Sequence, residues 1–184
     1  LDATNLQPSG GLAVAAAAIG ATEVTLTGTL TLAANLVAGG YLSVVVTPGI
    51  GHTYKIKGNT VVAAAANCVV TLEDPIRVAL TTDSKVIMAR NTYDSVVIEP
   101  GTPTAAIAGV AVNIITNGEF GWLQTRGPVG ALFTGTGVAG KAVGSLSGGT
   151  SGSLAPAIAA TNIAGYHMAT GITGEYSLID LVIG

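Results

Sequence analysis

The sequence predicts an all-β protein, an antiparallel β-sandwich or barrel in one or two β subdomains, with short Ala-rich helical pieces at most. Short runs of strand-forming residues recur about every 8–12 residues, as in sandwiches and barrels. Glycine contributes 26 of the 184 residues, and Gly, Asn and Pro separate the runs as turn residues do. The pair Asn117-Gly118 lies between two apolar runs, and this is the strongest short hairpin signal because both central residues of a type I′ turn need positive φ.

The first half of the chain alternates apolar and polar residues with the period of two that a half-buried strand requires. Tyr54 and Ile56 are expected to face the core, while Lys55 and Lys57 face solvent. Turn residues bound each run, so the pattern favours short strands over helices. After a strand near residues 24–32, the expected strands are residues 41–47, 52–57, 60–63, 68–72, 76–80, 85–90 and 95–99.

The best internal boundary lies at Pro100 and Pro103, because two prolines within four residues do not fit a central strand. Residues 1–21 are predicted to form an N-terminal arm, with an Ala-rich stretch that is compatible with helix but is expected to be extended on a neighbour. Residues 22–99 are predicted to form one β subdomain and residues 104–184 a second, barrel-like one, closing on a strand at 176–183. The Ala-rich stretch 154–169 is compatible with a short helix or a strand pair.

The predicted hairpin around Asn117-Gly118 is a ribbon with two apolar sides. A two-residue turn places Ile115 opposite Phe120, and Asn113 opposite Trp122, where the Asn113 amide oxygen accepts the indole N–H. Both sides of the ribbon must then be covered, either by the core of the chain or by a partner. The opposite side carries Val110, Val112, Ile114 and Leu123.

The sequence leaves open whether Trp122 lies in its own core or at a subunit contact. Loss of a core Trp damages folding itself, whereas loss of an interface Trp leaves a folded chain that no longer assembles. The candidate packing or interface residues are Ile115, Phe120, Trp122, Leu123 and Arg126.

Charged residues make up 9% of the chain, against roughly 25% in an average soluble protein. A surface with so few charges is poorly soluble in a monomer, so the composition favours a permanent assembly. The net charge of −3 and the scattered Lys and Arg residues argue against a nucleic-acid partner. No uninterrupted apolar run is long enough for a membrane-spanning helix, so no membrane partner is expected.

The candidate chemistry favours a non-enzymatic protein without catalytic, cofactor-binding or metal-binding residues. Residues 135–141 fit the phosphate-loop pattern, but the next residue is Ala142 where Ser or Thr is needed, and the Gly-rich stretch that follows does not favour a helix. His52 and His167 have no ligands at metal-binding spacing, and each is expected to be structural. Cys68 is expected to be a small buried side chain rather than a reactive thiol.

One stretch resembles a known family. Glu119-Phe-Gly-Trp-Leu-Gln-Thr-Arg-Gly-Pro-Val-Gly-Ala-Leu132, followed by Gly137-Val-Ala-Gly-Lys-Ala-Val143, is similar to the head decoration, or cement, proteins of tailed bacteriophages. Those proteins show an aromatic-Gly-Trp strand, then a small apolar strand and a short Ala-Gly turn. Ala108-Gly-Val-Ala111 and the closing strand 176–183 fit the same pattern, so the resemblance covers roughly residues 100–184.

The resemblance implies a virion structural protein on the capsid surface that stabilises the phage head by bridging capsid subunits. The implied partners are the major capsid protein and further copies of this chain, commonly in a homotrimer at local threefold positions. The resemblance implies no cofactor. The alternatives are a tail, fibre or other surface β-protein, and a glycan-binding or hydrolytic β-domain on a virion or cell surface.

Overall fold

The computed structural model describes residues 6–28, 31–63, 66–101, 106–145, 149–158 and 162–183. Contacts within the chain divide it into two compact units after Asp94, several residues before the expected boundary at Pro100 and Pro103. All secondary structure in the described residues is β, and the sheets are antiparallel, which confirms the predicted fold class. Each unit has its own buried core, so each is described separately below.

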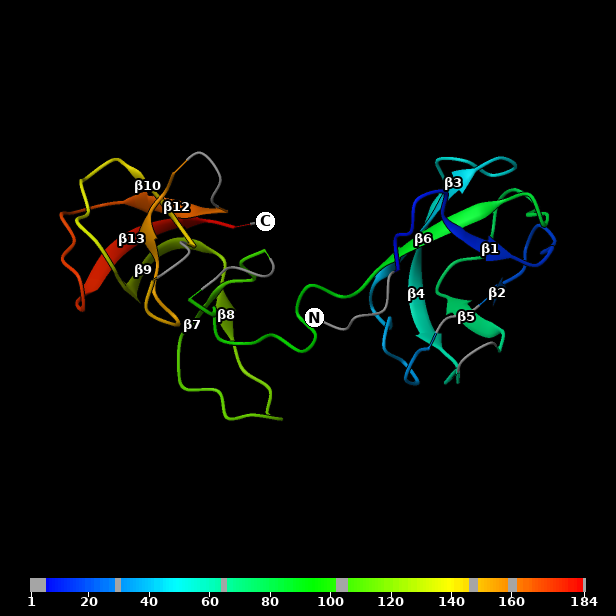
Figure 1. Cartoon of the computed structure of the whole chain (residues 1–184), viewed down its shortest axis with the longest axis horizontal. Helices are drawn as coiled ribbons and strands as arrows, with labels where there is room; N and C mark the ends of the chain where they lie inside the picture. Colours follow the sequence, from blue (N-terminus) through cyan, green and yellow to red (C-terminus); the bar gives the residue numbers. More distant parts are fainter. Residues whose placement is uncertain are drawn as a thin grey trace. The chain divides into compact units, whose positions relative to one another are not determined.

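The first unit is a closed six-stranded barrel (Figure 1). Its strand order is β1-β2-β5-β4-β3-β6, and pairing of β6 with β1 closes the barrel. The burial of alternate side chains along each strand follows the period of two in the sequence. The strands are β1 (Leu12–Val14), β2 (Glu23–Thr27), β3 (Tyr41–Val46), β4 (Thr53–Asn59), β5 (Cys68–Leu72) and β6 (Lys85–Ala89).

Apolar alternation predicts the barrel core well. Tyr54 and Ile56 are buried and Lys55 and Lys57 are exposed, as expected from the sequence. Cys68 is buried with its Sγ 3.8 Å from the Thr60 carbonyl oxygen, and this burial raises the pKa of the thiol. The structure therefore agrees with the prediction of a small buried side chain.

Four expectations for residues 1–99 need correction. Residues 60–63 form no strand, since only Val62 bridges to Leu32. Residues 12–14 do not form a free arm, because β1 pairs with β2 on one side and β6 on the other and thereby closes the barrel. Residues 76–80 form no strand, and only Leu80 bridges Ala17. Residues 95–99 also form no strand despite their strand-forming composition, and Val97 and Ile98 are exposed. Strand propensity has no effect there because the described residues supply no neighbouring strand.

The second unit contains a five-stranded sheet and a separate two-stranded sheet, which forms the base of the hairpin around Asn117-Gly118. The sheet order is β11-β10-β12-β13-β9, and β7 pairs with β8. The Ala-rich stretch 154–169 supplies a strand pair in its described residues rather than a helix. The strands are β7 (Val110–Ala111), β8 (Leu123–Gln124), β9 (Arg126–Leu132), β10 (Ala142–Gly144), β11 (Ala155–Pro156), β12 (Ile163–His167) and β13 (Tyr176–Val182).

This five-stranded sheet is curved and nearly closed. Phe133, just after β9, forms a parallel bridge with Leu154, just before β11, so its two edges meet at one point. The inner face buries Phe133, Val143, Ile179 and Leu181. The opposite face of β13 is exposed at every second residue, so only one face of this sheet is covered by its own unit.

Candidate functional site

The predicted hairpin around Asn117-Gly118 exists, but its turn type and register differ from the prediction. The Glu119 N–H donates to the Thr116 carbonyl at 3.0 Å, so the four-residue turn forms where expected. Only Gly118 has positive φ, +85°, as in a type II turn, whereas type I′ also needs positive φ at Asn117. A type II turn does not match the twist of paired strands.

The mismatch leaves the ribbon paired only at its base. Ala111 lies opposite Leu123, one residue away from the predicted pairing of Val112 with Leu123. A shift by one residue moves side chains to the other face of a ribbon. In agreement with this shift, no hydrogen bond forms between Asn113 and the Trp122 indole, and the Val112 N–H instead donates to the Trp122 carbonyl at 3.3 Å.

The five candidate residues are separated by the structure into exposed and half-buried sets. Phe120 is fully exposed and Trp122 is 81% exposed. Ile115 is half-buried and occupies the space that a side chain at Gly121 would need. Leu123 is half-buried at the ribbon base, and Arg126 is exposed opposite Val182 on β13. Within its own unit, Trp122 is therefore not a core residue, and the alternative, that it lies at a subunit contact, stays a prediction.

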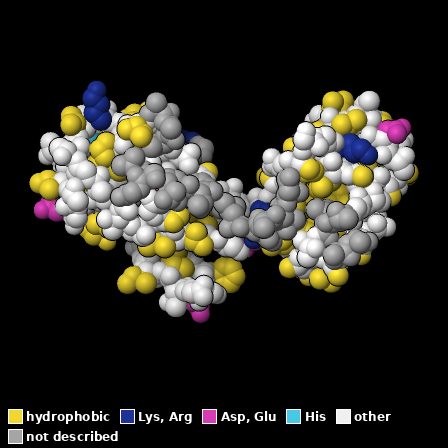
Figure 2. Space-filling model, in the orientation of Figure 1, with side chains coloured by type: hydrophobic (Ala, Val, Ile, Leu, Met, Phe, Trp, Pro, Cys, Tyr) yellow, Lys and Arg dark blue, Asp and Glu magenta, His cyan; other side chains and the backbone are white. Residues whose placement is uncertain are grey.

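The ribbon, defined as residues 112–122, carries a concentration of exposed apolar side chains. Ile114 and Val112 are exposed together with the two aromatic residues, and Glu119 is the single charge in the segment. Figure 1 shows this segment extending away from the five-stranded sheet beyond β7 and β8, and Figure 2 shows hydrophobic side chains at its end.

A second exposed apolar surface lies on the outer face of the five-stranded sheet. Tyr176, Leu178 and Val182 share this face of β13 with Asp180. Tyr166 of β12 lies opposite Asp180, so its side chain is on the same face. β9 pairs with the other edge of β13, where Pro128 lies opposite Asp180 and Gly130 lies opposite Leu178. This surface, called the outer face below, consists of Tyr166, Tyr176, Leu178, Asp180 and Val182 with Arg126, Pro128 and Gly130.

Gln124 protects the edge strand β9 from pairing with other chains. Its side-chain Nε2 donates to the carbonyl oxygens of Arg126 at 3.0 Å and Pro128 at 2.9 Å. Pro128 itself has no N–H to offer to an incoming strand. Gln124 lies in the motif that resembles decoration proteins, but this role was not predicted from the sequence. The available signal was Pro128, because Pro within a strand is typical of a sheet edge.

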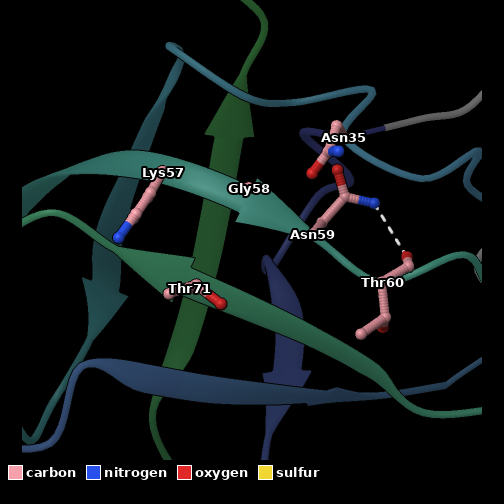
Figure 3. Close-up of a pocket in the computed structure, with 6 residues that line it drawn as sticks. All are labelled: Asn35, Lys57, Gly58, Asn59, Thr60 and Thr71. Atoms are coloured by element: carbon pink, nitrogen blue, oxygen red, sulfur yellow. Dashed lines mark hydrogen bonds between the residues drawn. The ribbon is translucent and has the colours of Figure 1, made fainter.

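A polar hollow of about 340 Å³ in the first unit is the other candidate (Figure 3). Asn59 is fully engaged there, since its Oδ1 accepts from the Val37 N–H and its Nδ2 donates to two carbonyls. In Figure 3 the Lys57 ammonium group points away from Asn35 and Asn59. A small-molecule site requires polar groups that converge on one point, and the polar groups of this hollow do not converge. The hollow is lined by Asn35, Lys57, Gly58, Asn59, Thr60 and Thr71.

His167 is buried in the core of the second unit at 3% exposure. Its ring packs edge-on against Phe133 with centroids 4.4 Å apart, and neither ring nitrogen has a hydrogen-bond partner among the described residues. Gly137 and Gly171 lie against the ring, and a side chain at either position would clash with it. Burial lowers the pKa of His167, so the imidazole is held neutral. This environment fits the structural role expected from the sequence.

The remaining predicted features also have structural roles. Residues 135–141 bridge to Gly171 and turn into β10, so this segment does not lead into the helix N-terminus that a phosphate loop needs.

Glu73 forms an exposed ion pair with Lys55 at 3.7 Å. Within the described ranges, no three acidic, His or Cys residues are grouped as metal ligands. The same ranges contain no helix long and apolar enough to cross a membrane.

Comparison with known proteins gives no match to a family model, a curated protein or a solved structure.

Proposed function

We propose that the chain is a non-enzymatic virion structural protein, a capsid decoration or cement protein that stabilises a phage head by bridging capsid subunits. One observation carries this proposal. Of the 22 large hydrophobic side chains that are exposed among the described residues, 16 lie in residues 95–184. That half carries only six of the chain's 17 charged residues: Glu99, Glu119, Arg126, Lys141, Glu175 and Asp180.

Exposed apolar side chains at this density are unusual for a protein that works as a free monomer, where large contiguous apolar patches are rare. Depletion of charge and enrichment of Trp, Tyr, Phe and Met are typical of the centre of a protein–protein interface. The second unit combines these properties on the ribbon and on the outer face, and both belong to the segment that resembles decoration proteins. Bridging by burial of apolar surface needs no cofactor and no catalytic group.

The test is to find the chain on purified virions and to image those particles by electron cryomicroscopy. The proposal expects peptides of this chain in stoichiometric amounts and density for it on the outside of the capsid, across boundaries between major capsid subunits. Removal of the chain is expected to lower the temperature at which the heads rupture. Density on the tail or fibres would favour the tail alternative, and specific binding on a glycan array would favour the glycan-binding alternative.

A further inference from the structure

The second unit exposes two apolar surfaces of different shape. The ribbon projects from the unit beyond β7 and β8 (Figure 1) and exposes Phe120, Trp122, Ile114 and Val112 along its length. The outer face is the uncovered side of a sheet, centred on β13. Neither surface covers the other within one unit, because the side chains of both are exposed in the same structure.

The ribbon is large enough to supply one half of a stable contact. Phe and Trp each bury roughly 150–250 Å² in an interface, and Val112 and Ile114 add to this. A stable interface needs roughly 800 Å² from each partner. The outer face offers a comparable set of exposed side chains in Tyr166, Tyr176, Leu178 and Val182.

The polar groups of the two surfaces are complementary. The Trp122 indole is a hydrogen-bond donor only and needs an acceptor when it is buried. At the centre of the outer face the Asp180 carboxylate lies between Tyr166 and Pro128, and it has no hydrogen bond or ion pair within the part of the chain that the structure describes. Covering this carboxylate with apolar groups that offer no donor is destabilising, so a partner that brings a donor to Asp180 is favoured.

We propose that the ribbon of one copy of this chain packs on the outer face of a second copy, with the Trp122 indole donating to Asp180 of that second copy. The inference depends on the proposed function, since it identifies the self-contact of the same surfaces. The contact is heterologous, because two different surfaces meet. An open chain of copies therefore keeps one free ribbon at one end and one free face at the other, until a ring closes.

Complementation between two variants tests this contact. In the ribbon variant, Phe120→Ser and Trp122→Ser remove the aromatic side chains. In the face variant, Leu178→Glu places a charge on the outer face. All three residues are exposed, so both variants are expected to keep the wild-type melting curve. Ile50→Ser is the matched control, because Ile50 is an exposed apolar residue in the first unit, outside both surfaces.

Sedimentation velocity over a wide concentration range gives the result. The wild type and the Ile50→Ser control are expected to self-associate, and each variant alone is expected to lose more than about 30-fold in association constant. An equimolar mixture of the two variants is expected to form dimers and nothing larger, since only one intact ribbon meets one intact face. If either variant misfolds, Ile114→Ser and Tyr176→Ser replace the ribbon and face substitutions respectively.

Three outcomes overturn the inference. A face variant that still dimerises alone indicates a ribbon-to-ribbon contact. A mixture that stays monomeric shows that the two surfaces do not meet. A wild-type chain that remains monomeric at every concentration excludes self-contact through these surfaces, yet leaves the proposed function to be decided by the particle experiment. Trp122→Phe keeps the ring but removes the N–H, and an unchanged association constant for this variant overturns the hydrogen bond to Asp180.

Discussion

The side-chain amide of Gln124 donates to the carbonyl oxygen of Pro128 at 2.9 Å, and also to that of Arg126, along the outer edge of β9. An unprotected edge strand presents backbone donors and acceptors to other chains. Here Pro128 removes one donor and Gln124 occupies two acceptors. This arrangement occupies part of the β9 edge while the outer face stays exposed, so the proposed contact through the face is separate from edge-to-edge pairing.

Replacement of Gln124 tests this edge protection. Gln124→Met keeps the length of the side chain but removes both hydrogen bonds, so we expect a loss of about 1–3 kcal/mol in unfolding free energy. The exposed β9 carbonyls are also expected to raise the rate of aggregation. Urea unfolding and light scattering measure the two effects. Gln7→Met is the control, since Gln7 lies in the other unit, and equal behaviour of the two variants would contradict the edge role.

The tight packing of β12 on β13 predicts different responses at two glycines of one sheet. At Gly165 an added Cβ would clash with the Asp180 backbone carbonyl, whereas at Gly130 an added Cβ meets nothing within 4 Å. Gly165→Ala is therefore expected to destabilise the second unit by about 1–3 kcal/mol or more. Gly130→Ala is expected to be neutral within about 0.5 kcal/mol. Calorimetry measures the melting temperatures of the two variants, and similar values would contradict the close packing of β12 on β13.

The neutral buried His167 predicts a loss of stability in acid. Its folded-state pKa lies below the unfolded value, so the unfolded chain binds the proton more readily as the pH falls below about 6.5. The contribution of neutral His167 to the unfolding free energy is therefore complete above that pH. It decreases as the pH falls towards the lower folded-state pKa, by at most about 1.4 kcal/mol per pH unit for one proton.

Unfolding curves of the second unit between about pH 7.5 and 5, roughly the range in which His titrates, measure this dependence. His167→Phe is expected to remove it, because Phe fills the space beside Phe133 without a titrating group. His52→Gln, in the first unit, is the control. Retention of the full pH dependence in His167→Phe would assign the effect to other groups.

Because Cys68 is buried, its thiol is expected to react slowly with labelling reagents in the native protein. The side chain is 1% exposed and burial raises its pKa, so both access and the thiolate fraction are low. Labelling with a thiol reagent is expected to follow unfolding of the barrel, with a rate that rises as urea is added. Labelling of the native protein as fast as of the denatured chain would contradict the closed barrel around Cys68.

Local pattern was enough to predict the elements that bury alternate side chains. Residues 68–72 and 176–182 are strands because Val, Ile and Leu recur there with a period of two. The same reasoning failed for β1, whose three residues Leu12–Val14 have no strand pattern of their own and are held by β2 and β6. It also failed at residues 95–99, where strand formers have no partner strand among the described residues.

The ribbon shows why register and exposure were less predictable than the turn itself. Asn117-Gly118 correctly predicted where the chain reverses, but not that only Gly118 takes positive φ. The two arms pair only at Val110–Ala111 and Leu123–Gln124, and Trp122 is 81% exposed beyond that base. The outer face was not predicted at all, because its members come from three strands and only sheet pairing brings them together.

Fluorescence of Trp122 tests the central claim most directly, because this is the only Trp of the chain. The ribbon is proposed to be exposed in the isolated chain and covered in the assembly. In dilute monomer we expect solvent-exposed emission that acrylamide quenches freely. On assembly, in solution or on the capsid, we expect emission at shorter wavelength and protection from the quencher. Emission that stays exposed after assembly, or that is already protected in the dilute monomer, would contradict the account.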